Sequence, residues 1–165
     1  TVWEAIGDLE QRGPDPAFNH VPNKHADKVV ARWENLAFGE SDPNYNRARL
    51  DPNKPSVTIR AGGGYGPSGN HLAGFHPPIH PTLPRQLTVR EAARIQGFPD
   101  DWFLCGPKTI QGRQIGNAVP VPLAKAVASH LAQLLASPPA RRDGQGHSPG
   151  ESGITVDGIP VGAGQ

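Results

Sequence analysis

Arginine residues surround a long Gly/Pro/His-rich loop that runs from residue 64 to residue 85. The guanidinium group offers planar, bidentate N–H donors that match the oxygens of phosphate and the major-groove edge of guanine. Seven arginines lie around this loop: Arg47, Arg49, Arg60, Arg85, Arg90, Arg94 and Arg113. For Arg90 and Arg94 the alternative is a helix face that is solvated or salt-bridged with Glu91.

Three histidines in the same loop have a spacing that could suit a metal ion. His71, His76 and His80 are five and four residues apart. They lie between prolines, without a cysteine partner and without helical register, so we expect no metal site. Loop polarity is the simpler interpretation, and contact with phosphate is the other.

Cys105 is the one cysteine, which excludes an internal disulfide and a cysteine-based zinc site. A nucleophilic thiol needs an oriented base beside it, and the histidines lie far away in the sequence. Its neighbours Trp102 and Leu104 predict a half-buried packing position. The residues Gly116 and Asn117 predict a turn with an exposed amide before an apolar run, although such a turn is ordinary loop chemistry.

The composition predicts much loop and an incomplete core. The 165 residues include 20 glycines and 19 prolines, 36% are hydrophobic, and the formal net charge is +1. Any basic surface must therefore be local. We find no signal peptide and no apolar tract that we expect to span a bilayer, so we expect a soluble, intracellular protein. Because the chain contains no Met, we also expect it to be a piece of a longer protein.

Hydrophobic spacing and turn residues predict the elements that position these side chains. Thr88 and Glu91 form a capping box at the start of a helix that Gly97 ends. We expect a disordered tail over 137–165. The predicted helices span 1–9, 26–39, 88–96 and 120–135, and the predicted strand spans 56–61.

Two segments resemble signature blocks of a known enzyme family in order, spacing and identity. RQLTVREAARIQGFPDDW (85–102) followed by RQIGNAVPVPLAKAVA (113–128) is similar to the last two blocks of bacterial DNA cytosine-5 methyltransferases. TVWEAIGDL (1–9) resembles the opening of that family's target-recognition region. RLDPNKPSVTIRAGGG (49–64) resembles its Arg-Leu…Pro-Ser-x-Thr-Ile pattern. The resemblance covers about residues 1–135.

The resemblance implies an α/β fold, or α+β for this piece alone. Residues 1–84 would form a target-recognition domain with short strands and long loops. Residues 85–136 would be C-terminal helices that complete a Rossmann-like S-adenosyl-L-methionine-dependent domain. In such enzymes a cysteine thiolate attacks C6 of a flipped cytosine, and C5 then accepts the methyl group. The residues that the match predicts to contact double-stranded DNA are Arg49, Thr58, Ile59, Arg60 and Arg85.

The same resemblance predicts that Asn117, Ala118 and Val119 form one wall of the S-adenosyl-L-methionine pocket. It assigns no catalytic residue here, because the family's Pro-Cys pair, Glu-Asn-Val block and Gly-rich cofactor turn are absent from the sequence. We therefore expect a missing N-terminal catalytic half, in the same chain or as a separate subunit, and no activity of this chain alone. The alternatives are a stand-alone DNA-binding module and the small subunit of a split methyltransferase. The expected setting is a restriction-modification system in the bacterial cytoplasm, without a membrane.

Overall fold

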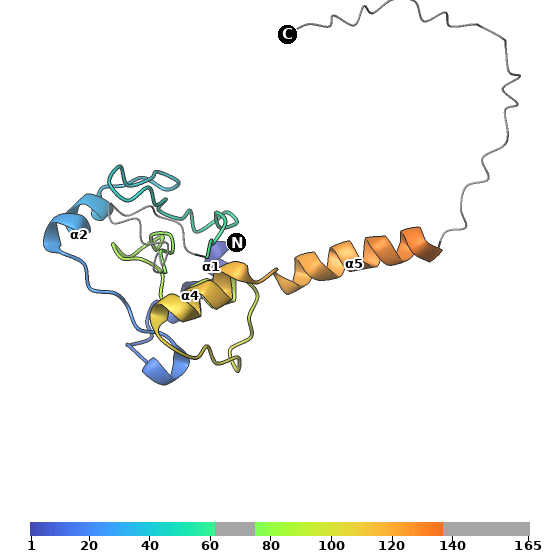
Figure 1. Ribbon diagram of the computed structural model, residues 1–165. Coiled ribbons are helices and arrows are strands. Elements are labelled where there is room, and N and C mark those ends of the chain that lie inside the picture. Colours follow the sequence, from blue (N-terminus) through green and yellow to red (C-terminus); the bar gives the residue numbers. More distant parts are fainter. Residues whose placement is uncertain (62–74, 137–165) are drawn as a thin grey trace, which may run out of the picture.

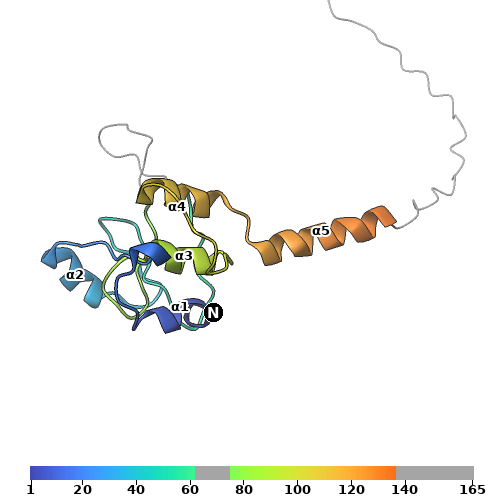
Figure 2. The ribbon, with the colours of Figure 1, turned by 90° about the horizontal axis from the view of Figure 1, so that it is seen from below.

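The computed structural model describes residues 1–61 and 75–136, and the regular elements within them are helices (Figure 1). Helices α1 to α4 gather in one body, and α5 projects away from it in both views (Figure 1, Figure 2). The α-helices are α1 (Val2–Ile6), α2 (Asp27–Glu34), α3 (Val89–Ile95), α4 (Lys108–Asn117) and α5 (Val121–Ala136). Short 3-10 turns cover Gly7–Leu9 and Pro16–Phe18.

Helix α3 is the centre of the body and lies between α1 and α4 (Figure 2). The predicted capping box is confirmed, since the Thr88 hydroxyl accepts from the backbone N–H of Glu91 and the Glu91 carboxylate accepts from the backbone N–H of Thr88. Gly97 follows the helix with a φ of 83°, a left-handed conformation that glycine adopts without strain. The predicted 88–96 helix is therefore confirmed.

Within residues 1–61 and 75–136, three small apolar clusters take the place of one large core. The first packs around α3 and α4, the second joins α1 to the start of α3, and the third lies under α2. Their buried members are, in that order, Ile59, Val89, Ala92, Ala93, Leu104 and Ile115; Val2, Ile6, Leu50 and Leu87; and Val29, Trp33, Leu36 and Ile79.

The two helices predicted in the N-terminal part are present with shorter bounds. Residues 1–9 form α1 and the 3-10 turn Gly7–Leu9, and Thr1 caps α1 together with Glu4. Helix α2 ends at Glu34 rather than at Gly39. Gly39 lies in the turn that follows, with a φ of 81°.

The predicted strand over 56–61 is wrong. The described residues hold isolated bridges and no named strand. A strand needs a neighbour to accept its backbone hydrogen bonds, and this segment lies instead along α4. The α/β architecture is thus not visible in the described part of the chain, which is helical with long irregular connections.

The predicted turn at Gly116 and Asn117 is also wrong, because these residues form the last turn of α4. A Cβ atom on Gly116 would overlap the backbone of Arg60 and Ala61, and one on Gly112 would overlap the Phe75 side chain. The two glycines are one helical turn apart and let the chain approach α4 closely.

Helix α5 confirms the helix predicted over 120–135, and none of its residues is buried. Together with α4 it forms the one segment of the described residues, Lys108–Ala136, that is long and apolar enough to cross a membrane by length and composition. The expectation that no apolar tract could span a bilayer therefore has this exception. However, the helix is interrupted at 118–120, and the 16 residues of α5 span only about 24 Å, less than a bilayer core of about 30 Å.

Candidate nucleic-acid interface

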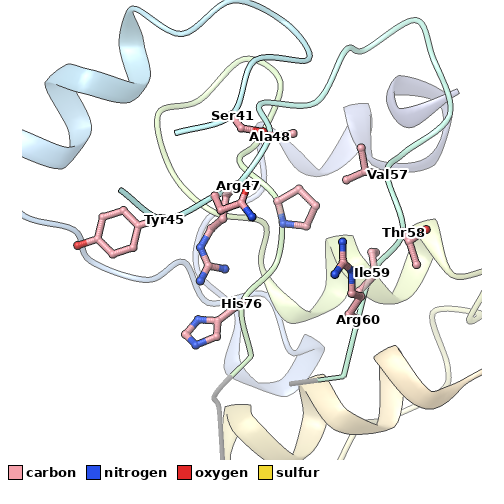
Figure 3. Close-up of a pocket in the computed structure, with 11 residues that line it drawn as sticks. Ser41, Tyr45, Arg47, Ala48, Val57, Thr58, Ile59, Arg60 and His76 are labelled. Atoms are coloured by element: carbon pink, nitrogen blue, oxygen red, sulfur yellow. The ribbon is translucent and has the colours of Figure 1, made fainter. Parts of the chain in front are cut away.

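An open groove of about 710 Å³ lies between two segments that carry basic side chains (Figure 3). One wall is the loop over residues 41–48, which we call the 41–48 hairpin because Ser41 and Ala48 pair as an antiparallel bridge. The other wall is residues 57–60, and His76 and Pro78 complete the lining. Among the described residues, the lining contains Arg47 and Arg60 and no acidic side chain.

Buried Asp42 braces the 41–48 hairpin from inside. One carboxylate oxygen accepts from Arg32 Nε at 2.7 Å and from the Trp33 indole N–H. The other accepts from the backbone N–H groups of Asn44 at 2.8 Å and Tyr45 at 3.1 Å. Burial would raise the pKa of Asp42, but these hydrogen bonds outweigh it and hold the pKa below its usual value. The hairpin is therefore fixed before any ligand binds.

On the second wall Ile59 is buried, and the other three residues of 57–60 are exposed. Thr58 and Arg60 are exposed, and no hydrogen bond from either side chain appears within the described residues. Ile59 is only 5% exposed and packs in the cluster of α3 and α4. Of the residues predicted to contact DNA, Thr58 and Arg60 are thus free to do so, whereas the Ile59 side chain is an anchor in the core.

Arg49 is bonded to the protein itself and does not line the groove. Its Nε donates to the Pro81 carbonyl at 2.9 Å, and its Nη1 donates to the carbonyls of Trp33, Glu34 and Leu36 at 3.3, 3.2 and 2.9 Å. The three carbonyls that Nη1 contacts lie at the C-terminal end of α2 and just beyond it, where a helix leaves acceptors unpaired and favours a cation. Arg49 therefore holds α2 in place, and its predicted contact with DNA stays a prediction.

Arg85 is likewise committed to an internal partner. Its two terminal nitrogens donate to the two carboxylate oxygens of Glu91 at 2.8 and 2.7 Å. The Glu91 side chain is fully buried and that of Arg85 is 14% exposed. Burial would raise the pKa of Glu91, but the hydrogen bonds and the charge of Arg85 hold it below the usual value. Arg85 is thus engaged in a largely buried ion pair, and its predicted DNA contact stays a prediction.

His80 belongs to the same buried network. Its Nδ1 accepts from the backbone N–H groups of Thr82 and Leu83, both at 3.2 Å, so the proton of the neutral ring must lie on Nε2. Nε2 lies 3.7 Å from a Glu91 oxygen. Burial lowers the pKa of His80 to about 4, and the ring is neutral at pH 7.

Arg90 and Arg94 follow the structural alternative. Arg90 is 1% exposed and donates to three backbone carbonyls at 2.8 to 3.1 Å, that of Phe18 in the 3-10 turn and those of Pro99 and Trp102 after α3. Arg94 makes a bidentate pair with Asp100 at 2.8 and 2.7 Å and also bonds Asp8. Both guanidinium groups are thus bonded within the protein, Arg90 in its interior and Arg94 nearer the surface.

The histidines do not come together as a set. His76 lines the groove, His80 is buried, and His71 lies outside the described residues. No group of three or more His, Cys, Asp or Glu side chains that could hold a metal is present in the described ranges. The half-buried position predicted for Cys105 is wrong: Cys105 is exposed, and the neighbouring Leu104 fills the core instead.

The three residues predicted to face a cofactor lie together at the C-terminal end of α4. Asn117 is exposed, Ala118 is partly buried, and Val119 is 62% exposed. The amide of Gln96 donates to the Ile115 carbonyl at 3.0 Å and fixes this end of the helix. Such an exposed surface can form one wall of a site but does not enclose one.

Comparison with known proteins decides the family. Residues 6–133 match the family model described as C-5 cytosine-specific DNA methylase. The chain belongs to this family. The methylase signature thus extends over both groove walls, over α3 and α4, and into most of α5.

Relatives of this methylase chain include type II methyltransferases. The chain is 36% identical over 144 residues to M.BbvI of Brevibacillus brevis, a match that covers 77% of the chain and 35% of the relative. It is 34% identical over 142 residues to M.MthTI of Methanothermobacter thermautotrophicus, covering 79% of the chain and 42% of the relative. The shared regions lie in a part of each relative, so the methylase chain spans well under half of their length.

A solved structure supports the same relationship. A crystal structure of an E. coli prophage protein, described as a DNA modification methyltransferase, is 34% identical to the methylase chain with a TM-score of 0.56. The likeness covers 81% of this chain and 33% of that one. The helical arrangement described above is therefore one that a methyltransferase structure contains.

The sequence did not predict the 41–48 hairpin as a wall of the groove, nor the helical conformation of α4. A signal for the hairpin is present in Ser41-Asp42-Pro43-Asn44, because Asp, Pro and Asn are turn residues. Helix α4 gives almost no apolar periodicity, since glycine occupies part of its buried face.

Proposed function

We propose that the chain is the target-recognition and closing part of a DNA cytosine-5 methyltransferase that acts in a restriction-modification system. The groove supports this most directly: its two walls carry Arg47 and Arg60, and its lining has no carboxylate. With a net charge of only +1, the chain has no general attraction for DNA, so a local basic groove is the place where phosphates would bind. Double-stranded DNA is the proposed partner.

Within this proposal, residues 57–60 hold the DNA backbone near the target base. Thr58 and Arg60 present a hydroxyl and a guanidinium to the groove side, and Ile59 fixes their position by packing under α3. Arg49 and Arg85 act as supports, because their donors are used inside the protein. Residues 1–84 are then mainly the recognition region and residues 85–136 the closing segment.

The end of α4 fits one side of an S-adenosyl-L-methionine site. The exposed Asn117 amide can donate and accept hydrogen bonds, and the backbone of Ala118 and Val119 continues the same surface. Bound there, the cofactor would supply an electrophilic methyl group for C5 of cytosine. These residues would orient it, while Gly116 keeps the DNA-holding segment directly against the same helix.

The catalytic cysteine and the rest of the cofactor site would come from the part of the enzyme that this sequence lacks. Helix α5 supports this view, because its large apolar residues, including Leu123, Val127 and Leu131, are all more than half exposed. Packed on the catalytic half, α5 would complete a Rossmann-like domain. The enzyme would work in the bacterial cytoplasm, where its DNA is.

A stand-alone DNA-binding module is the second candidate. The observation that favours it is the set of three core clusters within residues 2–115, which can hold the groove together without another chain. A small subunit of a split methyltransferase would use the same groove and the same α5 surface.

Reconstitution tests the proposal. The chain is mixed with a catalytic portion from the same locus that carries the Pro-Cys and Glu-Asn-Val blocks, and methyl transfer from S-adenosyl-L-methionine to plasmid DNA is measured. We expect methylation by the mixture and by neither part alone, with bisulfite sequencing placing the methyl groups on one short sequence. An inactive mixture of folded parts, with no such block encoded at the locus, would refute the proposal. Salt-dependent DNA binding by the chain alone, without any methylation, would support the second candidate.

A further inference from the structure

Arg47 is the basic side chain on the hairpin wall of the groove, opposite the wall that carries Arg60 (Figure 3). The two walls are separate segments, so a ligand that lies in the groove meets a guanidinium from each side. The groove-lining residues for which the family signature suggests DNA contact lie on the Arg60 wall. The signature assigns no role to the hairpin wall.

No carboxylate neutralises Arg47 within the described residues. The carboxylate whose charge acts on Arg47 is that of Asp42. Both Asp42 oxygens, however, already accept hydrogen bonds from other groups. The Gln86 amide faces the guanidinium, and in the orientation that satisfies both groups its oxygen accepts from Arg47 Nε at 3.2 Å and from Nη1 at 3.3 Å. This contact orients the Arg47 guanidinium but, since an amide is neutral, leaves its positive charge available to a ligand.

The guanidinium of Arg47 is held in position before a ligand binds, whereas that of Arg60 is not. Arg47 is half-buried and lies on the braced 41–48 hairpin, whereas Arg60 is exposed. Burial lowers the pKa of Arg47, although a guanidinium stays protonated at neutral pH. A fixed, partly desolvated donor loses less conformational entropy on binding and bonds more strongly than one in open water.

We propose that Arg47 is a second DNA-contacting arginine, which donates a bidentate hydrogen bond to the duplex from the hairpin wall while Arg60 contacts it from the other wall. The inference rests on the proposed function and adds to it a residue that the family signature does not point to. A phosphate group and the O6 and N7 edge of guanine both accept this bidentate donor. The two acceptors predict different consequences for binding.

The test compares Arg47→Met and Arg47→Lys in the complete methyltransferase, once bisulfite sequencing has identified its site. Dissociation constants are measured on cognate and single-mismatch duplexes over a series of salt concentrations. If Arg47 holds phosphate, Arg47→Met weakens binding to all duplexes alike and reduces the salt slope by about 1, and Arg47→Lys keeps most of that slope. If Arg47 reads guanine, both variants lose about tenfold or more of the discrimination at one base pair.

Lys28→Met is the matched control, since Lys28 is exposed on α2 and does not line the groove. It should leave affinity, salt slope and discrimination unchanged. Unchanged values in both Arg47 variants, with wild-type melting temperatures, would overturn the inference while the wild-type enzyme still binds. Lack of DNA binding by the wild-type enzyme itself would instead overturn the proposed function, and this inference with it.

Discussion

His80, Glu91 and Arg85 form a buried network whose protonation couples to stability. Burial lowers the pKa of His80 from 6.5 to about 4. Between pH 6.5 and about pH 4 the unfolded chain binds a proton at His80 and the folded chain does not. The contribution of neutral His80 to the free energy of unfolding is therefore fully present above about pH 6.5 and is lost as the pH falls toward about 4. The lowered pKa of Glu91 adds a loss in the same direction, because this stabilisation is present above its usual pKa of 4.5 and lost below.

We expect His80→Asn to flatten this pH dependence. The Asn oxygen can take the place of Nδ1 as acceptor for the backbone N–H groups of Thr82 and Leu83, but it does not titrate. The wild-type protein should lose up to about 3 kcal/mol of unfolding free energy from His80 between pH 6.5 and pH 4, and the variant should lose clearly less. Urea midpoints measured at several pH values by tryptophan fluorescence give the comparison. His130→Asn, on the exposed face of α5, is the control, and parallel curves for His80→Asn and wild type would contradict the assignment.

The arginines show why the sequence could predict the groove only in part. Thr58 and Arg60 follow from a local motif, and the structure leaves both exposed. Arg49 has the same motif support, yet its acceptors are carbonyls 13 to 32 residues away. Arg90 bonds a carbonyl 72 residues away. A sequence shows that an arginine is present, but whether a distant acceptor already holds it depends on the tertiary fold.

Helix α4 connects the two candidate contact surfaces. Its last turn carries Asn117, and Gly116 in the same turn supports the backbone of Arg60 and Ala61. The surface proposed for the cofactor and the segment proposed for DNA are therefore neighbours on one helix. The distance between them depends on the absence of a side chain at position 116.

We expect Gly116→Ala to displace the 57–60 wall. The new Cβ meets backbone atoms, which cannot rotate away as a side chain can, so the cost should be about 1–3 kcal/mol even though alanine favours the helix. DNA affinity of the complete enzyme should fall with the melting temperature. Gly13→Ala is the matched control, because a Cβ at Gly13 meets nothing within 4 Å. A variant with wild-type stability and DNA affinity would show that the wall tolerates the shift.

The helices were predictable where caps and apolar spacing agree, as in α1, α3 and α5. Helix α4 was not, since its residues 108–117 include two glycines that weaken helix propensity and leave no apolar stripe. The 56–61 segment shows the opposite error: its alternating pattern is that of a strand, and Ile59 is indeed buried while Val57 is 49% exposed. The pattern thus marks one buried position rather than a buried face, and a strand also requires a paired neighbour.

The described part of the molecule ends in helix α5, none of whose residues is buried among the described residues. An isolated helix of 16 residues is only marginally stable in water, and most helical stability comes from packing an apolar face. Leu123, Val127, Leu131 and Leu134 lie within one stripe of α5 and are 52–58% exposed. The proposed catalytic half would cover this stripe and so stabilise α5.

We expect Leu131→Glu to destabilise the complete methyltransferase and to reduce methylation. Burying a leucine contributes about 1.5–3 kcal/mol, and a buried unpaired carboxylate adds a further cost, so the loss should be at least about 2 kcal/mol. Ser129→Glu is the matched control, because it adds the same charge two residues away on the polar side of α5. Melting temperature and methyl transfer are measured for both variants. If both variants match wild type, α5 does not pack on the catalytic half through this stripe. If both lose stability equally, the charge alone matters. A loss confined to Leu131→Glu is the result that the exposed stripe predicts, because only that side of the helix would lie against another surface.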